Sequence, residues 1–345
     1  MQKILIIGFG FMGSLHAQVY SRLRHASLVG IVDEREAAAR EKLRGLGLDV
    51  PVYPDLDTAL AAGRPDAVDV CVPTPHHART VRAAIAAGCH VFCEKPFAPT
   101  DREARALADL ARRAGIRMQI GQCIRFWPEY QALEKFHRSG RGGPLRSLYL
   151  YRRSGRPSYS VGNWLDRADE SGGAAFDLHV HDTDFVHHLL GAPQAVSSVG
   201  TRDAGGWSHI FTTYRFPDIA VTASGGWNYP AQWGFQMGFE AIYERAVIEY
   251  DSRSATPLMI TEGRRPRRPL PFHPPKVGEA KAGGGNLSAL GGYYNELRYF
   301  IDCLERGIDP AIATPDQGAE SVRTILAEIK SAATGRTITL APASR

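Results

Sequence analysis

The sequence predicts an α/β protein in which a parallel, doubly wound sheet is followed by a second, largely antiparallel sheet. Over the first 122 residues, short apolar segments alternate with helical segments, as is typical of parallel sheets. After residue 125 the apolar segments look longer, contain many Trp, Tyr, Phe, Val and Thr residues, and are no longer each followed by a helix. The length of 345 residues also suggests two domains. We therefore expect domains at residues 1–122 and 123–345.

A glycine motif lies between the first predicted strand and the first predicted helix. Residues 3–7 (KILII) are apolar and β-branched, which predicts a buried strand. G-x-G-x-x-G follows at residues 8–13, and a helix is expected over 14–22. A second strand over 28–32 ends at Asp33, 20 residues after the last glycine. Strand, glycine turn, helix, strand and acid together predict dinucleotide binding.

Each residue of this motif has a physical role. Gly8 permits the tight turn, Gly10 leaves room for the pyrophosphate, and Gly13 lets the helix pack close to the strand. The N-terminus of the helix offers free N–H groups and a partial positive charge to the phosphate. Asp33 can accept hydrogen bonds from a ribose diol and would repel a 2′-phosphate, which predicts NAD. Arg35 could face a 2′-phosphate, so NADP is the alternative.

Further candidates follow the ends of other predicted strands. Ligands of doubly wound sheets bind outside the carboxyl ends of the strands, so residues at these ends are expected to meet the cofactor. The predicted cofactor-binding residues are Gly8, Phe9, Gly10, Phe11, Met12, Gly13, Asp33, Arg35, Pro73, Thr74, His77, Glu94, Lys95 and Gln122.

Lys95 is also a candidate catalytic residue. It lies at a predicted strand end beside the cofactor edge, and Pro96 stiffens the backbone after it. Its ammonium could hydrogen-bond an alcohol oxygen as hydride leaves the carbon, which would favour an alkoxide-like transition state. The alternative is a surface lysine paired with Glu94, and position alone does not separate the two.

A second dense stretch, residues 172–184 (GGAAFDLHVHDTD), precedes a helix predicted over 176–190. In that helix Asp177, His181 and Asp184 stack on one face. A carboxylate one turn from an imidazole can orient it and raise its basicity, so His181 is a candidate general base. The alternative is a helix start in which His181 is merely packed. His179 and Asp182 add metal-ligand types, but alternate residues on a helix point apart, and we expect no metal.

Composition narrows the class of protein. Hydrophobic residues make up 44% and charged residues 22%, as in an ordinary soluble protein, and the net charge of +5 gives no argument for nucleic acid. The arginines at 264–268 are expected in a solvated loop spanning 262–286. Five cysteines without a CxxC pair are expected to be reduced, buried thiols in a cytoplasmic protein. We expect no signal peptide and no membrane span.

Several of these segments together resemble one family. They are the glycine motif at 8–13, the stretch from Thr74-Pro75 to Glu94-Lys95-Pro96, residues 125–130 (RFWPEY), residues 172–184, and a tail with YNEL at 294–297 and Thr314-Pro315. The sequence resembles, over nearly its whole length, the Gfo/Idh/MocA family, named for glucose–fructose oxidoreductase and inositol dehydrogenase.

The resemblance implies a Rossmann domain followed by an α/β domain with a large open, mostly antiparallel sheet, through which dimers or tetramers form. Its members are mostly NAD(P)-dependent oxidoreductases of sugars, cyclitols and their derivatives. Their catalytic lysine, aspartate and histidine match Lys95, Asp177 and His181 here. The chain departs from the family at Arg79, where a His is frequent, and at Cys89, where a Lys is frequent; neither position touches the expected chemistry.

Together these observations predict oxidation of a secondary alcohol of a sugar or inositol-type cyclitol to a ketone. The alternatives are redox-neutral, NAD-dependent glycoside chemistry and a non-catalytic, cofactor-dependent sensor. His179 and Asp184 are further candidates for the pocket. The residues expected to contact the substrate are Lys95, Arg125, Trp164, Asp177, His181 and Tyr293.

Overall fold

The computed structural model describes residues 1–158, 160–278 and 290–340, which form two compact units. Within the described ranges, the first unit contains residues 1–123, 160–162, 275–278 and 290–322. The second contains residues 124–158, 163–274 and 323–340. The chain thus returns to the first unit at residues 275–278 and 290–322, after most of the second unit.

The first unit is built on a six-stranded sheet in the order β3-β2-β1-β4-β5-β6. Every pairing in it is parallel, which confirms the predicted doubly wound sheet. The strand order reverses between the neighbours β1 and β4, and ligands of such sheets bind at this switch point. The strands are β1 (Gln2–Ile7), β2 (Ala26–Val32), β3 (Val52–Tyr53), β4 (Ala67–Val70), β5 (His90–Glu94) and β6 (Met118–Gly121).

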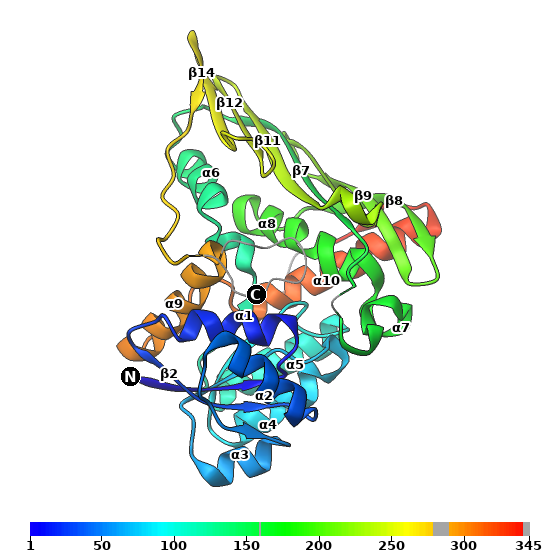
Figure 1. Ribbon diagram of the computed structural model, residues 1–345. Helices are drawn as coiled ribbons and strands as arrows, with labels where there is room; N and C mark the ends of the chain where they lie inside the picture. Colours follow the sequence, from blue (N-terminus) through cyan, green and yellow to red (C-terminus); the bar gives the residue numbers. More distant parts are fainter. Residues whose placement is uncertain (159, 279–289, 341–345) are drawn as a thin grey trace. The chain divides into compact units, whose positions relative to one another are not determined.

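Helices cover both faces of this sheet. Figure 1 shows α1 and α9 on one face and α3 and α4 on the other. α1 and α4 lie on opposite faces because right-handed crossovers in opposite directions require it. α1 begins at Phe11, three residues earlier than predicted, because Gly13 is accommodated within its first turn. The helices are α1 (Phe11–Tyr20), α2 (Glu36–Leu46), α3 (Leu56–Ala62), α4 (His77–Ala86), α5 (Asp101–Arg113) and α9 (Gly291–Arg306).

The central strands of this sheet end in register. Ile7, Val70, Cys93 and Ile120 lie side by side on β1, β4, β5 and β6. The residues that follow these four therefore share one edge of the sheet. This is the edge where the sequence predicts the cofactor.

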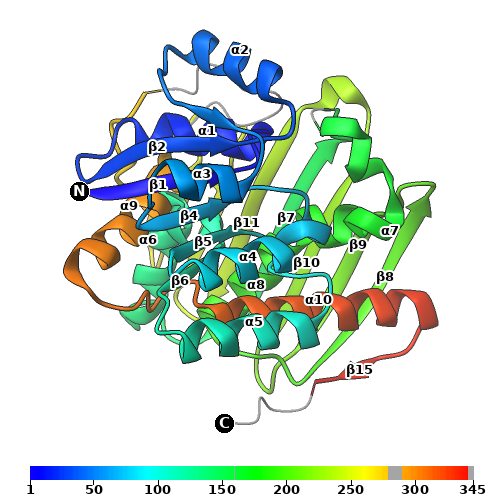
Figure 2. The same cartoon turned by 90° about the horizontal axis from the view of Figure 1, so that it is seen from below.

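The second unit contains a nine-stranded sheet in the order β14-β13-β12-β11-β7-β10-β9-β8-β15 (Figure 2). β7 and β10 pair in parallel and the other neighbours are antiparallel, which confirms the prediction of a mostly antiparallel sheet. The strands are β7 (Leu145–Gly155), β8 (Ala195–Asp203), β9 (Gly206–Arg215), β10 (Ala220–Tyr229), β11 (Phe235–Tyr243), β12 (Ala246–Asp251), β13 (Leu258–Glu262), β14 (Arg265–Pro269) and β15 (Ile338–Thr339).

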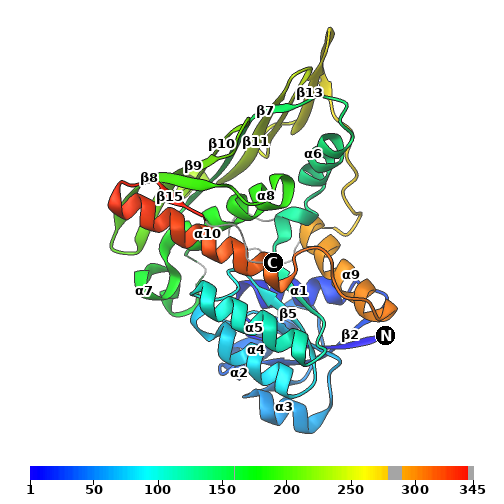
Figure 3. The same ribbon diagram turned by 180° about the vertical axis from the view of Figure 1, so that it is seen from behind.

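Helices of the second unit lie on one face of this sheet. α6 (Pro128–Arg138), α8 (Val180–Leu190) and the C-terminal part of α10 (Pro315–Thr334) are on the same side of it (Figure 3). A short helix, α7 (Ala168–Ser171), precedes the segment that leads into α8. Residues of β9 from Ile210 onward alternate between buried and exposed, and Phe211 is 48% exposed. The sheet therefore buries one set of side chains beneath its helices, as antiparallel sheets commonly do.

Two local predictions need correction. The loop expected over 262–286 contains a strand, because a hairpin at Gly263 (φ +57°) lets Arg265–Pro269 pair with β13. Ion pairs from Arg267 to Glu249 and from Arg268 to Glu262, each 2.8 Å, stabilise this hairpin. Residues 279–286 of the predicted loop lie outside the described residues.

The helix expected from residue 176 is also irregular at its start. Ala175–His179 form a π-helical turn, in which the N–H of Val180 donates to the carbonyl of Ala175 five residues earlier. α8 continues from Val180 as a regular α-helix. The spacing of one ideal α-helix therefore does not apply around Asp177.

The expectation of five reduced, buried thiols is confirmed except for the burial of Cys71. All five cysteines are free, four of them buried and Cys71 partly exposed. Among the described residues, none of the helices has the length and apolar character needed to span a bilayer.

Candidate active site

The glycine turn after β1 is closed on one side and open on the other. Gly8 has φ +92°, and a Cβ there would lie 2.7 Å from the carbonyl oxygen of Cys71. A Cβ on Gly13 would lie 2.0 Å from the carbonyl oxygen of Gly8, so neither position admits a side chain. A Cβ on Gly10 would meet no atom within 4 Å. The open side beside Gly10 is where the motif is expected to receive a pyrophosphate.

Asp33 is tied to this turn. Its Oδ2 accepts the N–H of Phe9 at 2.8 Å, and its Oδ1 accepts the N–H of Arg35 at 2.9 Å. The Arg35 guanidinium folds back onto the same carboxylate, with Nε 3.4 Å from Oδ1. Asp33 is only 9% exposed, whereas about half of the Arg35 side chain is exposed. The carboxylate is therefore oriented beside the turn, where a ribose diol could bind it.

Lys42, on α2, is a residue that the sequence argument missed. Its Nζ donates to the carbonyls of Phe9 and Gly10 at 3.2 and 3.1 Å. Burial and the nearby Arg35 charge lower its pKa. The residue lies nine positions beyond Asp33 on a helix face, and no motif marks it. Its contacts place a positive charge at the carbonyl side of the glycine turn.

The other strand ends carry buried polar residues. Thr74, Glu94 and Gln122 are each at most 6% exposed. His77 is fully enclosed, with Nδ1 2.9 Å from the carbonyl of Pro96 and Nε2 2.9 Å from that of Val72. Burial lowers the pKa of His77. The contacts of His77 join the loop after β4 to the loop after β5, and its predicted contact with the cofactor stays a prediction.

Lys95 follows β5 directly and is partly exposed. Its backbone N–H donates to Oε2 of Glu94 at 3.1 Å. The Glu94 carboxylate is thus turned toward the backbone of the catalytic candidate. The Lys95 side chain therefore belongs to the same edge as the glycine turn, within one sheet.

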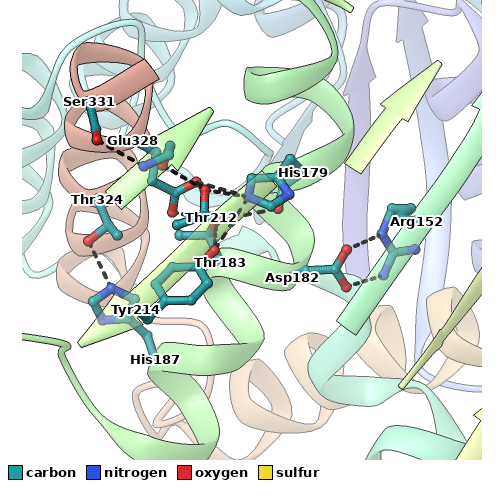
Figure 4. A network of polar contacts seen from close by, with 11 residues as sticks. Arg152, His179, Asp182, Thr183, His187, Thr212, Tyr214, Thr324, Glu328 and Ser331 are labelled. Atoms are coloured by element: carbon teal, nitrogen blue, oxygen red, sulfur yellow. Dashed lines mark hydrogen bonds and ion pairs between the residues drawn. The ribbon is translucent and has the colours of Figure 1, made fainter. Parts of the chain in front are cut away.

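In the second unit, side chains around His181 point in different directions. Asp177 and His181 are partly exposed, whereas Asp182 and Asp184 are buried. Asp182 pairs with Arg152 of β7 at 3.0 and 3.3 Å (Figure 4), and Asp184 pairs with Arg125 at 2.7 and 2.8 Å. Burial raises the pKa of Asp182, and the Arg152 charge opposes that rise. Asp177 and His181 are consequently the accessible acid and imidazole of this segment.

The side chain of His179 is buried and belongs to a network of polar side chains from α8, β9 and α10 (Figure 4). Its Nε2 lies 2.9 Å from Glu328 of α10 and 3.3 Å from the Thr212 hydroxyl. Thr183 also donates to Glu328, at 3.0 Å. Glu328 thus holds residues on both sides of His181, and the contacts of His179 are structural.

The residues predicted to contact the substrate divide between the units. Lys95 and Tyr293 lie in the first unit, whereas Arg125, Trp164, Asp177 and His181 lie in the second. Arg125 is 2% exposed and paired with Asp184, and Tyr293 is 6% exposed. Trp164 is partly buried against a cluster formed by Leu165, Ala174 and Trp227. Contact between any of them and a substrate stays a prediction.

The first unit fits a dinucleotide on its own geometry: a turn open beside Gly10, an oriented Asp33 and the N-terminus of α1, which has no side-chain cap. Comparison with known families agrees. The family model described as "Oxidoreductase family, NAD-binding Rossmann fold" (GFO_IDH_MocA) matches residues 2–122, and the "GFO/IDH/MocA C-terminal domain" matches residues 130–249. The chain belongs to the Gfo/Idh/MocA oxidoreductase family.

Relatives within the Gfo/Idh/MocA family match over almost the whole chain. Inositol 2-dehydrogenase of Rhizobium meliloti (strain 1021) is 27% identical, over 97% of this chain and 98% of its own length. Myo-inositol 2-dehydrogenase of Thermotoga maritima is 26% identical over 91% of each. Levoglucosan dehydrogenase, solved with NADH and levoglucosan, superposes with a TM-score of 0.84 at 21% identity, over 98% of this chain and 99% of its own. The structural likeness establishes the shared fold.

These matches confirm the predicted family and the predicted class of enzyme. The protein is an NAD-binding oxidoreductase of the Gfo/Idh/MocA family, and its glycine turn lies in the segment that the family's NAD-binding model matches. That the residues at its strand ends contact the cofactor stays a prediction.

Proposed function

We propose that this oxidoreductase catalyses the reversible, NAD-dependent oxidation of a secondary alcohol of a sugar or cyclitol to a ketone. The observation that carries the proposal is the row of strand ends in the first sheet, which sets Lys95 on the edge that also carries the glycine turn and Asp33. The inositol dehydrogenases among the relatives support the substrate class.

Three side chains carry the proposed chemistry. His181 takes the proton of the substrate hydroxyl, and Asp177 orients its imidazole and raises its basicity. The Lys95 ammonium stabilises the negative charge that develops on the same oxygen. A bound nicotinamide would supply the acceptor for the hydride that leaves the carbon. Both His181 and Asp177 are accessible for this role, while the neighbouring acids are held in buried ion pairs.

We further propose that NAD is preferred to NADP. The Asp33 carboxylate is fixed beside the glycine turn by two backbone N–H groups, where its charge opposes a 2′-phosphate. Arg35 lies on that carboxylate and offsets part of the charge, so we expect a preference rather than full exclusion of NADP.

Absorbance of reduced nicotinamide tests the proposal directly. Purified protein is mixed with NAD or NADP and with inositols, free sugars and sugar phosphates in turn. We expect signal with NAD and one group of polyols. Product formation without net NADH, from protein that co-purifies with NAD, would instead establish redox-neutral chemistry. Confirmed NAD binding with no turnover across the panel would favour a sensor.

A further inference from the structure

A buried histidine connects the cofactor helix to the strand that carries Lys95. His16, on α1, is fully buried. Its Nδ1 lies 2.8 Å from Oδ2 of Asp69 on β4, and its Nε2 lies 3.2 Å from Oε1 of Glu94 on β5. One imidazole therefore spans two neighbouring strands with a carboxylate opposite each ring nitrogen.

This arrangement favours the charged form of the ring. Nδ1 is hydrogen-bonded to Asp69, whereas Nε2 lies near the Glu94 carboxylate without making a hydrogen bond to it. Both negative charges favour the protonated ring. Burial lowers the pKa of His16, but the Asp69 carboxylate and the neighbouring Cys71 together raise that pKa well above its usual range. The titratable groups around the ring are Tyr20 on α1, Asp69 on β4, Cys71 directly after β4, Glu94 on β5 and Tyr293 on α9.

The second oxygen of Glu94 leads to Lys95. While Oε1 faces His16, Oε2 accepts the backbone N–H of Lys95 at 3.1 Å. On its other side, the Glu94 side chain lies against Gly121, where a Cβ would come within 3.1 Å of the carboxyl group. Glu94 thus lies between the His16 ring and the backbone of β6. Through its two carboxylate oxygens it connects His16 on α1 to the backbone N–H of Lys95, directly after β5.

We propose that His16 is a positioning residue, which fixes Glu94 and through it the backbone of Lys95 relative to the glycine turn that begins α1. The inference rests on the proposed function, because that function makes Lys95 the group that stabilises charge on the substrate oxygen. His16 lies too deep to act on a substrate itself, so it acts only through Glu94. The position of Lys95 relative to a cofactor bound at the start of α1 is then fixed.

A metal centre is the competing interpretation, because donor atoms of His16, Asp69 and Cys71 lie within 4.8 Å of one another. The contacts favour hydrogen bonding instead. The Cys71 thiol donates to Oδ1 of Asp69 at 3.3 Å, and burial together with the Asp69 charge raises its pKa well above the usual range. A metal would need the thiolate. Hydrogen bonds therefore join the thiol, the carboxylate and the imidazole of this cluster to one another.

The test compares His16→Gln, Glu94→Gln and their double variant with the wild-type enzyme, using His25→Gln as a control because 61% of the His25 side chain is exposed. We expect His16→Gln to lower kcat by about 10-fold to 100-fold, since small displacements of catalytic groups cost that much. KM for NAD and NADH affinity, read from nicotinamide fluorescence, should stay within about twofold of wild type. The double variant should lose no more than the worse single variant, because both substitutions break one connection.

Each other outcome has a defined meaning. If Lys95→Met abolishes turnover while His16→Gln and Glu94→Gln leave kcat within twofold of wild type, the inference is wrong and the proposed function stands. If Lys95→Met retains turnover, the proposed function fails first. Should His16→Gln not fold, Glu94→Gln alone decides, because Gln keeps the shape of Glu94 and can still accept the Lys95 N–H. One equivalent of zinc in the purified enzyme, lost with His16→Gln, would overturn the inference in favour of a metal centre.

Discussion

The two units present their candidate functional residues in different ways. In the first unit, Tyr293 apart, they follow the ends of parallel strands, and the register of four strands brings those ends to one edge. In the second unit, Arg125 and Trp164 apart, they lie along one helical segment. There the side chains of His179, Asp182 and Asp184 turn into buried contacts, and those of Asp177 and His181 stay partly exposed. For a residue at the end of a parallel strand, the sequence therefore predicts where the side chain lies. For a residue on a helix, the direction of the side chain also depends on how regular the helix is and how it packs.

The largest expected effect tests one residue from each unit. Lys95→Ala and His181→Ala should each lower kcat by about 10³-fold, in the range that charge stabilisation and proton transfer contribute. NADH binding, followed by nicotinamide fluorescence, should change far less than kcat, because the glycine turn and Asp33 stay intact in both variants. His188→Ala on the same helix, whose imidazole instead pairs with Glu134, serves as the control. A loss of NADH affinity as large as the loss of kcat would contradict the assigned roles.

The next effect separates a buried ion pair from a substrate contact. Arg125→Met leaves the Asp184 carboxylate buried without its bidentate partner, so the free energy of unfolding should fall by about 3 kcal/mol. Arg138→Met, which removes an exposed pair with Glu134, should change it by less than about 1 kcal/mol. Urea unfolding of the three proteins measures the difference. A large rise in KM for the polyol with unchanged stability would instead make Arg125 a substrate contact.

Much of the first unit could be predicted because its signals are local. The alternation of strands and helices, together with G-x-G-x-x-G, predicts both the sheet and its functional edge. Lys42 and His16 escaped that argument, because each acts through contacts with residues distant in sequence. A lysine on an amphipathic helix carries no signal of the carbonyl groups it will meet.

The second unit shows where sequence patterns fall short. The π-helical turn at Ala175–His179 depends on how this segment packs against β9 and β10, where Gly225 leaves room for the His179 ring. No periodicity in 172–184 indicates that turn. The strand Arg265–Pro269 was missed because Pro and Arg disfavour a strand prediction, while its ladder and ion pairs to Glu249 and Glu262 are non-local.

A smaller effect concerns the choice of cofactor at the first edge. Asp33→Asn removes the charge but keeps an oxygen for the N–H of Phe9. The ratio of kcat/KM for NADP to that for NAD should rise by about tenfold, equivalent to roughly 1.4 kcal/mol. Arg35→Met should lower the same ratio if its guanidinium faces a 2′-phosphate. Initial rates with both cofactors at fixed polyol decide this, and an unchanged ratio in Asp33→Asn would remove Asp33 from cofactor discrimination.

The smallest expected effect is the contribution of His16 to the free energy of unfolding. It is small because burial disfavours the charged ring, whereas the Asp69 carboxylate favours it. The pKa of His16 is higher in the folded state than the unfolded value of about 6.5, so folding favours its protonated form. Its contribution to stability is then complete below about pH 6.5 and is lost as pH rises through the folded-state pKa. We expect the stability difference between wild type and His16→Gln to shrink over that alkaline interval.

Urea unfolding across the pH series measures the difference, and an NMR titration, assigned by the signal missing in His16→Gln, locates the pKa. A difference that grows with pH would show that His16 is buried as the neutral ring, and α1 would then be joined to the Lys95 strand without a charge.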